Sequence, residues 1–438
     1  MKITVAGTGY VGLVTGVCLA SKGHRVTCVD IDEEKIMIMK KGKSPIYEPG
    51  LEELMQKNLD KLHFTTDYQS AYKKADVIFI GVGTPEKQDG SANLKYVYSV
   101  AKQIANSVET NCVVVVKSTV PIGTNEKIET FIKANLKHDV NVFIASNPEF
   151  LSQGTAVHDT LFASRIVLGV EEEYAAEILK KVYKDFEAPI LVMNRKSAEM
   201  VKYASNDFLA LKISYINEIA NFCETVGANI EDVTKGMGYD PRIGNRFLKA
   251  GIGYGGSCFP KDTKALNWLA NFNDNEIKTV RAAIDVNEIQ KFKLIKKAKK
   301  YYEDFNGLTV AVLGLTFKPG TDDLREAPSL VNVPWLLEEG ALVKAWDPVG
   351  EDNFKSKISG NIIYCETIEI ALEDADICFI FTEWGEIRRM DPSLFVARMK
   401  TPVILDGRNC FDLKKMSELP LDYISVGRPE VLNNKRKI

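Results

Sequence analysis

Short apolar runs alternate with helical patterns along the first third of the chain. These runs lack a polar residue at every second position, which is typical of parallel strands that helices cover on both faces. The pattern therefore predicts a parallel sheet with strands at residues 3–6, 25–30, 76–82, 112–117 and 142–146, extended by residues 166–170.

The middle of the chain has a different pattern. Apolar residues recur at spacings of three and four over residues 196–226 and 262–300, which predicts long helices. Residues 236–259 between them are rich in glycine and aromatic residues and are expected to form a loop. We expect one continuous helix near residues 277–303 that connects two domains stiffly. Strands then resume, at residues 308–315, 342–347, 377–381 and 403–406.

This organisation predicts an α/β protein in which two Rossmann-like, doubly wound domains are joined by a central all-helical domain. A chain of 438 residues fits about three domains. We expect the domains to span residues 1–195, 196–303 and 304–438. The short basic tail at residues 433–438 is expected to be a solvated terminus.

Composition and charge narrow the class of protein. Hydrophobic residues make up 45% of the chain and charged residues 26%, which is typical of a globular protein. Lys and Arg number 56 against 59 Asp and Glu, so the basic excess of a nucleic-acid binder is missing. No apolar run approaches the roughly 18 residues that span a bilayer, and no export signal is visible. We expect a cytoplasmic protein without a nucleic-acid or membrane partner.

The eight cysteines are scattered and form no CxxC pair. This spacing argues against a zinc site and a disulfide framework, so we expect no metal and a reducing compartment. All four histidines lie at or before position 158. Chemistry in the later two thirds of the chain must therefore use other residue types.

A glycine-rich turn follows the first predicted strand. In Gly7-Thr8-Gly9-Tyr10-Val11-Gly12, the first glycine suits a tight turn, the second lets a pyrophosphate approach, and the third allows helix–strand packing. The helix that begins here presents free N–H groups to phosphate. Asp30 ends the second strand, where a carboxylate holds a ribose 2′-hydroxyl and repels a 2′-phosphate. We therefore expect NAD. Lys35 either bonds adenosine or phosphate oxygens or is a solvated lysine.

Further polar residues follow the next strands of this sheet. Ligands of doubly wound sheets lie beyond the carboxyl ends of the strands. The hydroxyls of Thr84, Ser118 and Thr119 are therefore placed to touch a cofactor or substrate, or else they cap the next helix. Glu149 follows a later strand and belongs to the same rim.

Cys258 lies in the stretch that carries most chemical information, residues 245–262. Gly253, Gly255 and Gly256 let the backbone run close to a ligand, and Pro260 suits the first turn of the next helix. A helix N-terminus and a nearby cation, Lys261, both lower the pKa of a thiol and favour the thiolate.

Three polar residues accompany this cysteine. Asp262 lies in the same helical turn, near enough to take or relay a proton. Lys202 and Asn206 are four residues apart on one helix face, where a cation and an amide suit a developing oxyanion. Solvent exposure of that pair is the ordinary alternative.

These motifs resemble those of the UDP-glucose/GDP-mannose dehydrogenase family over essentially the whole chain. The resemblance rests on residues 7–12, 117–121, 147–151, 202–206, 245–262, 317–325 and 406–408. It implies a four-electron oxidation of UDP-glucose to UDP-glucuronate by two NAD+ in succession. Cys258 would hold the C6 aldehyde as a thiohemiacetal and then as a thioester that water hydrolyses.

The resemblance also implies roles for other residues. Lys202 and Asn206 would stabilise oxyanions, and Asp262, Thr119 and Glu149 would position water or relay protons. The identity of the general base stays open. NAD would bind at Gly7, Gly9, Tyr10, Val11, Gly12, Asp30, Lys35, Thr84, Ser118, Thr119, Glu149, Lys261 and Arg325.

The nucleotide sugar would bind between the central and C-terminal parts. Its expected contacts are Glu149, Phe150, Leu151, Lys202, Asn206, Phe247, Leu248, Lys249, Gly255, Cys258, Phe317, Lys318 and Arg408. Arg242 would reach the site from a neighbouring subunit, so a homodimer or larger homo-oligomer is expected. Arg325 has an alternative, an ion pair with Asp322 or Asp323. Gln153 departs from the glutamate that is frequent in the family, which puts a charged role there in doubt.

Three alternatives remain. The same chemistry could act on GDP-mannose or a UDP-N-acetylhexosamine. A two-electron hydroxyacid dehydrogenase would need the lysine–asparagine pair but no covalent cysteine. A non-catalytic NAD or nucleotide sensor would leave the combination of Cys258, Lys202 and Asp262 unexplained.

Overall fold

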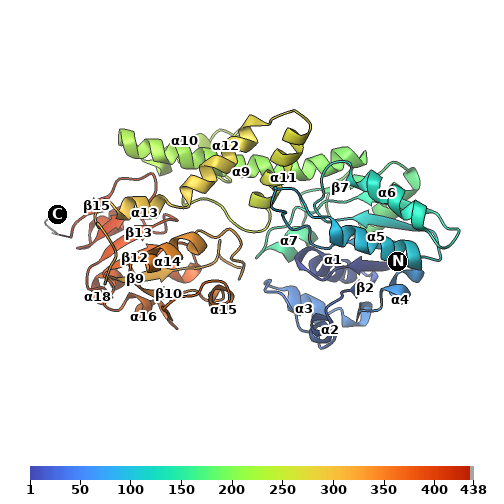
Figure 1. Cartoon of the computed structure of the whole chain (residues 1–438), viewed down its shortest axis with the longest axis horizontal. Coiled ribbons are helices and arrows are strands. Elements are labelled where there is room, and N and C mark those ends of the chain that lie inside the picture. Colours follow the sequence, from blue (N-terminus) through green and yellow to red (C-terminus); the bar gives the residue numbers. More distant parts are fainter. Residues whose placement is uncertain (435–438) are drawn as a thin grey trace. The chain divides into compact units, whose positions relative to one another are not determined.

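The computed structural model describes residues 1–434, so residues 435–438 of the basic tail lie outside the described residues. The chain packs as two compact units, Met1–Ser205 and Asn206–Ile438. One long helix, α9 (Arg195–Val226), begins in the first unit and continues into the second. Each unit contains one sheet with helices around it (Figure 1).

The first unit is built on an eight-stranded sheet of order β3-β2-β1-β4-β5-β6-β7-β8. All neighbouring strands are parallel except β6 and β7. The strands are β1 (Lys2–Ala6), β2 (Arg25–Val29), β3 (Leu62–Thr65), β4 (Val77–Ile80), β5 (Cys112–Val116), β6 (Val142–Ser146), β7 (Ile166–Gly169) and β8 (Ile190–Met193). The helices are α1 (Tyr10–Ser21), α2 (Glu33–Lys40), α3 (Leu51–Gln56), the 3₁₀ helix η1 (Leu59–Lys61), α4 (Tyr68–Lys73), α5 (Lys95–Ser107), α6 (Thr124–Asn135), α7 (Ala156–Leu161) and α8 (Glu173–Val182).

The second unit contains a seven-stranded sheet of order β11-β10-β9-β12-β13-β14-β15, in which only β14 and β15 pair antiparallel among the described strands. The strands are β9 (Thr309–Leu313), β10 (Leu342–Trp346), β11 (Ile362–Tyr364), β12 (Ile377–Ile380), β13 (Val403–Asp406), β14 (Asp422–Ile424) and β15 (Val431–Leu432). The helices are α10 (Ile230–Gly238), α11 (Phe259–Phe272), α12 (Lys278–Gln290), α13 (Lys293–Ala298), α14 (Ser329–Glu338), α15 (Glu351–Lys355), α16 (Ile368–Leu372), α17 (Gly385–Arg389), α18 (Ser393–Arg398) and α19 (Leu413–Ser417).

The central strands are buried on both faces. In β5, Val113 and Val115 belong to one apolar core, while Val114 and Val116 belong to the core on the opposite face. Because successive side chains of a strand point to opposite faces, a strand without polar alternation needs cover on both sides. The expected α/β architecture with two mainly parallel sheets is confirmed.

The prediction of one continuous helix near residues 277–303 is wrong. The structure has three separate helices, α11, α12 and α13, over the part of the chain that was predicted to be helical from residue 262 to residue 300. The first break is the segment at residues 273–277, in which Asp274 has a positive φ of 52°. The second break lies at Lys291 and Phe292, where the Lys291 carbonyl accepts a hydrogen bond of 2.9 Å from Asn332 Nδ2. A carbonyl that bonds outside its own helix marks the interruption.

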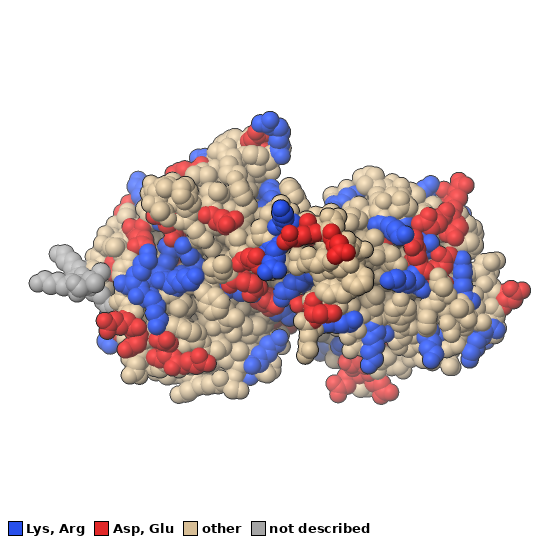
Figure 2. Space-filling view, turned by 45° about the horizontal axis from the view of Figure 1, so that its top comes forward, with Lys and Arg blue, Asp and Glu red and all other residues tan. Residues whose placement is uncertain are grey.

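Surface charge, helix hydropathy and the placement of metal-ligand residues add three findings. Acidic and basic side chains are interspersed on the face shown in Figure 2. Within residues 1–434, no helix is long and apolar enough to cross a membrane. The same residues contain no group of three or more His, Cys, Asp or Glu side chains placed to hold a metal ion.

Candidate active site

The glycine-rich turn joins β1 to α1. Gly7 has a φ of +92°, in the left-handed region that favours glycine. A Cβ at Gly12 would lie 1.9 Å from the carbonyl oxygen of Gly7, so this helix position admits only glycine. A Cβ at Gly9 would meet no atom within 4 Å, and Gly9 is the N-cap of α1 without a side-chain cap. The open space at this helix N-terminus fits a pyrophosphate.

Asp30 follows β2 and lies beside this turn. Its Oδ2 atom accepts hydrogen bonds from the backbone N–H of Thr8 (2.7 Å) and from the Thr8 hydroxyl (2.6 Å). Burial opposes ionisation, but the bonds from Thr8 outweigh it and hold the pKa of Asp30 below its ordinary value. The charged carboxylate fits ribose hydroxyls. Lys35 on α2 is partly exposed, with its Nζ 3.8 Å from Asp32 Oδ2.

The hydroxyls at the ends of β4 and β5 hold the two loops together. Thr84 Oγ1 donates to the carbonyl of Thr119 (2.9 Å), and Ser118 Oγ donates to that of Val82 (2.6 Å). Both hydroxyl-bearing residues are buried. The two hydroxyls therefore bond loop carbonyls rather than capping a helix, and they fix the rim beyond the strands.

Glu149 and Lys202 form a buried ion pair in the first unit. Lys202 Nζ donates to Glu149 Oε1 and to the Glu149 carbonyl, both at 2.8 Å. Glu149 Oε2 accepts from the backbone N–H of Leu151 at 2.8 Å. The Phe150 ring lies between two cations, 5.6 Å from Lys202 Nζ and 3.9 Å from the Arg165 guanidinium. The loop that follows β6 is thereby tied to α9.

Lys117, at the end of β5, is a buried cation that the sequence marked only as a strand end. Its Nζ donates to Asn147 Oδ1 at 3.0 Å. Its pKa is lowered to about 8, chiefly by burial and also by the Lys202 ammonium, while the Glu149 carboxylate works in the opposite direction. The lone polar residue at the end of an apolar strand is the signal that could have identified it.

Cys258 is the N-cap of α11 in the second unit. Of the eight cysteines, Cys258 and Cys410 are partly exposed and the other six are buried. The Cys258 Sγ lies 3.7 Å from the Ser257 hydroxyl. The predicted helix start is confirmed, with Pro260 in the first turn.

Asp262 is fully buried one turn into the same helix. Its Oδ1 accepts from Lys261 Nζ and its Oδ2 from Asn206 Nδ2, each at 2.7 Å. The backbone N–H of Asp262 donates to the Cys258 carbonyl at 2.8 Å. A charged acceptor therefore lies one helical turn from the thiol, with both of its oxygens oriented by side chains.

Asp207 is a buried carboxylate that the sequence does not reveal, because it resembles an ordinary helix carboxylate. It is buried, and neither carboxylate oxygen has a hydrogen-bond partner among the described residues. Burial, reinforced by the charge of Asp262, raises its pKa to about 8. No feature of the sequence separates it from the many exposed carboxylates of the chain.

The glycines before Cys258 approach protein rather than open space. A Cβ at Gly255 would lie 2.6 Å from the Glu326 carbonyl, and one at Gly256 would lie 2.7 Å from the Phe317 ring. The Gly256 N–H donates to the Arg325 carbonyl at 2.7 Å. These contacts, rather than the expected closeness to a ligand, explain the glycines in this structure.

Arg408 links the same loop to the C-terminal sheet. Its guanidinium donates to the carbonyls of Phe381 (2.8 Å), Gly253 (2.9 Å) and Phe317 (3.3 Å). Arg408 therefore stabilises the loop that contains Gly253, and its guanidinium lies next to Phe317.

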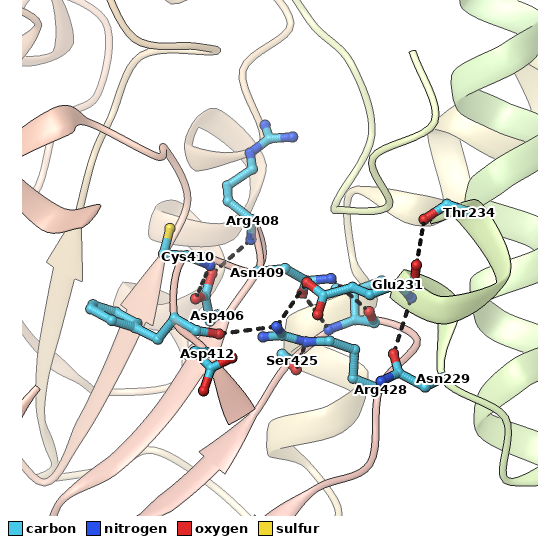
Figure 3. A network of polar contacts seen from close by, with 12 residues as sticks. Asn229, Glu231, Thr234, Asp406, Arg408, Asn409, Cys410, Asp412, Ser425 and Arg428 are labelled. Atoms are coloured by element: carbon cyan, nitrogen blue, oxygen red, sulfur yellow. Dashed lines mark hydrogen bonds and ion pairs between the residues drawn. The ribbon is translucent and has the colours of Figure 1, made fainter. Parts of the chain in front are cut away.

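A polar network orients the backbone around Arg408 (Figure 3). Asp406 accepts from the N–H groups of Arg408 (2.8 Å) and Cys410 (2.6 Å) and from the Tyr423 hydroxyl (2.7 Å). The Tyr423 hydroxyl accepts from Arg428 Nη2 at 2.6 Å, and Arg428 Nη1 donates to Glu231 Oε1 of α10 at 3.0 Å. The network therefore joins the Arg408 turn to the central helices.

Five further residues were expected to contact NAD or the nucleotide sugar, and the structure shows the surroundings of each. Arg325 pairs with Asp323 at 2.6 Å, the alternative that the sequence left open, and its Nε also bonds that carboxylate. Burial opposes its charge, but Asp323 and Cys258 raise the pKa of Arg325. Phe247 is exposed, with a φ of 63°, Leu248 is buried and Lys249 is exposed. Lys318 Nζ lies 5.6 Å from the Phe317 ring.

Comparison with known proteins decides the family. Residues 1–187, 196–289 and 311–413 match the NAD binding domain, the central domain and the UDP binding domain of the UDP-glucose/GDP-mannose dehydrogenase family. The chain belongs to this family. The expected membership is confirmed, and Cys258 lies in the central-domain match while Phe317 and Arg408 lie in the UDP-binding match.

Relatives cover the whole chain. The chain is 50% identical to the UDP-glucose 6-dehydrogenase YwqF of Bacillus subtilis, covering 99% of both chains. A UDP-glucose 6-dehydrogenase of Rhizobium meliloti is 45% identical, over 98% of this chain and 100% of the relative. A solved UDP-glucose dehydrogenase from Pyrobaculum islandicum is 37% identical with a TM-score of 0.91, covering 98% of each chain. A UDP-D-ManNAc dehydrogenase from Pyrococcus horikoshii is 28% identical with a TM-score of 0.86, over 98% and 99%.

Proposed function

We propose that this chain oxidises UDP-glucose to UDP-glucuronate with NAD+, through a covalent intermediate on Cys258. The relatives from Bacillus subtilis and Rhizobium meliloti are both named UDP-glucose 6-dehydrogenase. The observation in the structure that supports the covalent route best is the position of Cys258. It is a partly exposed thiol at the N-cap of α11, one turn before the buried Asp262 carboxylate.

The first unit has the groups to hold the dinucleotide. The N-terminus of α1 at Gly9 would bind the pyrophosphate, and Asp30 would accept the ribose hydroxyls. Thr84, Ser118 and Thr119 would line the nicotinamide end. When bound, NAD+ supplies the hydride acceptor for each two-electron oxidation.

The expected catalytic residues have separate tasks in this proposal: Cys258, Asn206 and Asp262 belong to the second unit, and Lys202, Glu149 and Thr119 belong to the first. A thiolate at Cys258 adds to the C6 aldehyde and keeps the carbon attached to the enzyme until water releases the acid. Asp262, held by Lys261 and Asn206, positions that water or takes its proton. Lys202 and Asn206 stabilise the oxyanions, while Glu149 and Thr119 remain candidates for the general base.

Substitution of the two partly exposed cysteines tests this assignment. Cys258→Ser is expected to lower kcat for UDP-glucose by at least about 100-fold while the Kd for NADH stays within about twofold. Cys410→Ser is the matched control and is expected to keep normal kcat, since burial and Asp406 raise the pKa of that thiol. A Cys258→Ser enzyme with normal turnover would remove the covalent route.

The sugar is the second question. The likeness to the UDP-glucose dehydrogenase from Pyrobaculum islandicum exceeds that to the UDP-D-ManNAc dehydrogenase in both identity and TM-score. We therefore favour UDP-glucose over UDP-N-acetylhexosamines, and the names of the relatives from Bacillus subtilis and Rhizobium meliloti favour it over GDP-mannose. Parallel assays of kcat/KM with UDP-glucose, GDP-mannose and UDP-N-acetylglucosamine test the preference.

Assembly, location and domain boundaries belong to the same proposal. We propose a cytoplasmic homodimer or larger homo-oligomer with domains at residues 1–195, 196–303 and 304–438. Arg242, whose side chain is 87% exposed and paired with Asp240, would complete the site of a neighbouring subunit. Mixed Arg242→Ala and Cys258→Ser subunits should then regain activity, because one site of each mixed dimer has both residues.

A further inference from the structure

A buried glutamate outside the expected site connects the nucleotide turn to the loop after β6. Glu48 lies between α2 and α3 and is 7% exposed. Its Oε1 accepts from the backbone N–H of Ala156 and its Oε2 from that of Gly154, both at 2.7 Å. Oε2 also accepts a hydrogen bond from the Tyr10 hydroxyl. Three donors from two distant parts of the chain therefore meet on one carboxylate.

The first of these parts is the nucleotide turn. Tyr10 is the first residue of α1, directly after Gly9. Its hydroxyl also accepts from the Gly154 N–H at 3.1 Å, so each of Tyr10, Glu48 and Gly154 is hydrogen-bonded to the other two. Helix α1 packs against both α3 and α7 (Figure 1).

The second part is the start of α7. Thr155 is the N-cap of this helix, and its side chain makes no capping bond. The Glu48 carboxylate instead accepts from the backbone N–H groups of Gly154 and Ala156, on either side of Thr155. An N-terminal helix amide without an acceptor is costly, so the position of this loop end depends on Glu48.

The opposite end of the same loop is held by the ion pair of Glu149 and Lys202. Glu149 bonds the Leu151 N–H and the Lys202 ammonium. Residues 149–156 are thus held at one end by a carboxylate bound to Lys202 and at the other by a carboxylate bound to Tyr10. The loop has direct contacts to both expected binding regions of the first unit.

We propose that Glu48 is a positioning residue that couples dinucleotide binding at the α1 turn to the ordering of residues 149–156, and so to nucleotide-sugar binding. The identities of the two ligands rest on the proposed function. A dinucleotide that fixes the α1 turn also fixes Tyr10, and through Glu48 it lowers the entropy cost of ordering the loop. Such coupling is reciprocal, so each ligand raises the affinity for the other by the same factor.

The test measures affinities on the full-length protein with NADH and UDP-glucose, a pair that does not react. The coupling factor is the ratio of the UDP-glucose Kd without NADH to that with saturating NADH. We expect a factor of about 5 or more for the wild type. Glu48→Gln should lower it to about 1 while each Kd alone changes less than about threefold, because the amide puts an N–H where all three partners are donors.

Two further variants separate positioning from folding. Tyr10→Phe removes only the bridging hydroxyl and should also lower the factor, and adding it to Glu48→Gln should have no further effect. Glu52→Gln is the matched control. Its carboxylate accepts from the Ser44 N–H at 2.8 Å, and among the hydrogen bonds of residues 1–434 it has none to Tyr10 or to residues 149–156, so the factor should be unchanged.

Hydrogen exchange gives a readout that does not depend on the sugar. NADH alone should slow amide exchange of residues 150–156 in the wild type but not in Glu48→Gln. A wild-type factor near 1, an unchanged factor in Glu48→Gln and Tyr10→Phe, or equal loss of both single-ligand affinities would overturn the proposal. Absence of UDP-glucose binding with intact NADH-dependent protection would instead overturn the proposed substrate.

Discussion

The Nζ atom of Lys202 lies 2.8 Å from Oε1 of Glu149, and the exposed fractions of these side chains are 3% and 6%. Removing one partner of a buried ion pair leaves an uncompensated charge, which costs about 3–5 kcal/mol. Lys202→Met is therefore expected to lower the free energy of unfolding of the first unit by that amount. Urea titration followed by a probe in this unit measures the change.

The double variant is the control for this pair. Lys202→Met combined with Glu149→Gln removes both charges and should recover much of the lost stability. Independent, additive losses in the two single variants would show that the pair does not interact energetically, contrary to the geometry.

Replacing Gly9 or Gly12 of the glycine-rich turn with alanine is expected to have different effects. Gly9→Ala places a methyl group in open space, so the protein should fold with a near-normal Tm but bind NADH at least about tenfold more weakly. Gly12→Ala places a methyl group 1.9 Å from the Gly7 carbonyl, so this variant should lose stability as well as binding. Equal Tm values for the two variants would contradict the packing described for Gly12.

Asp207 predicts an unusual pH dependence of stability. Its pKa rises from 3.8 to about 8 on folding, so the folded state keeps a proton that the unfolded state releases above about pH 4. The contribution of Asp207 to stability therefore falls as the pH rises from about 4 to about 8. Asp207→Asn removes this loss. Its advantage over the wild type should grow by up to about 1.4 kcal/mol per pH unit between pH 5 and 7.

Denaturant titrations at pH 5, 6 and 7 test this behaviour. The exposed Asp139 provides the matched control, because Asp139→Asn should leave the pH dependence of the wild type unchanged. Parallel stability curves for Asp207→Asn and the wild type would mean that Asp207 does not retain a proton in the folded state.

The sequence predicted the central strands well and the edge strands poorly. Strands such as β5 are apolar because both faces are covered, and this pattern is visible without a structure. The strands that the pattern missed are β3, β8, β11, β14 and β15, which lie at the outer positions of the two sheets. Four of these five are short and partly exposed, so their apolar pattern is weak.

The site shows a similar division. Cys258 and the glycine turn could be located because their chemistry requires particular residue types at fixed spacing. Glu48 and Asp207 could not, because their importance comes from burial and from partners far away in the sequence. The continuous helix near residues 277–303 failed for the same reason: the break at Lys291 depends on Asn332, a contact that helical periodicity does not reveal.

The stoichiometry of the reaction tests the central claim most directly. The purified enzyme is incubated with excess NAD+ and a limiting, known amount of UDP-glucose until the absorbance of NADH stops rising. Covalent capture by Cys258 followed by a second oxidation predicts two NADH per UDP-glucose consumed, with UDP-glucuronate as the product. One NADH per sugar, with release of a free aldehyde, would contradict the proposed mechanism.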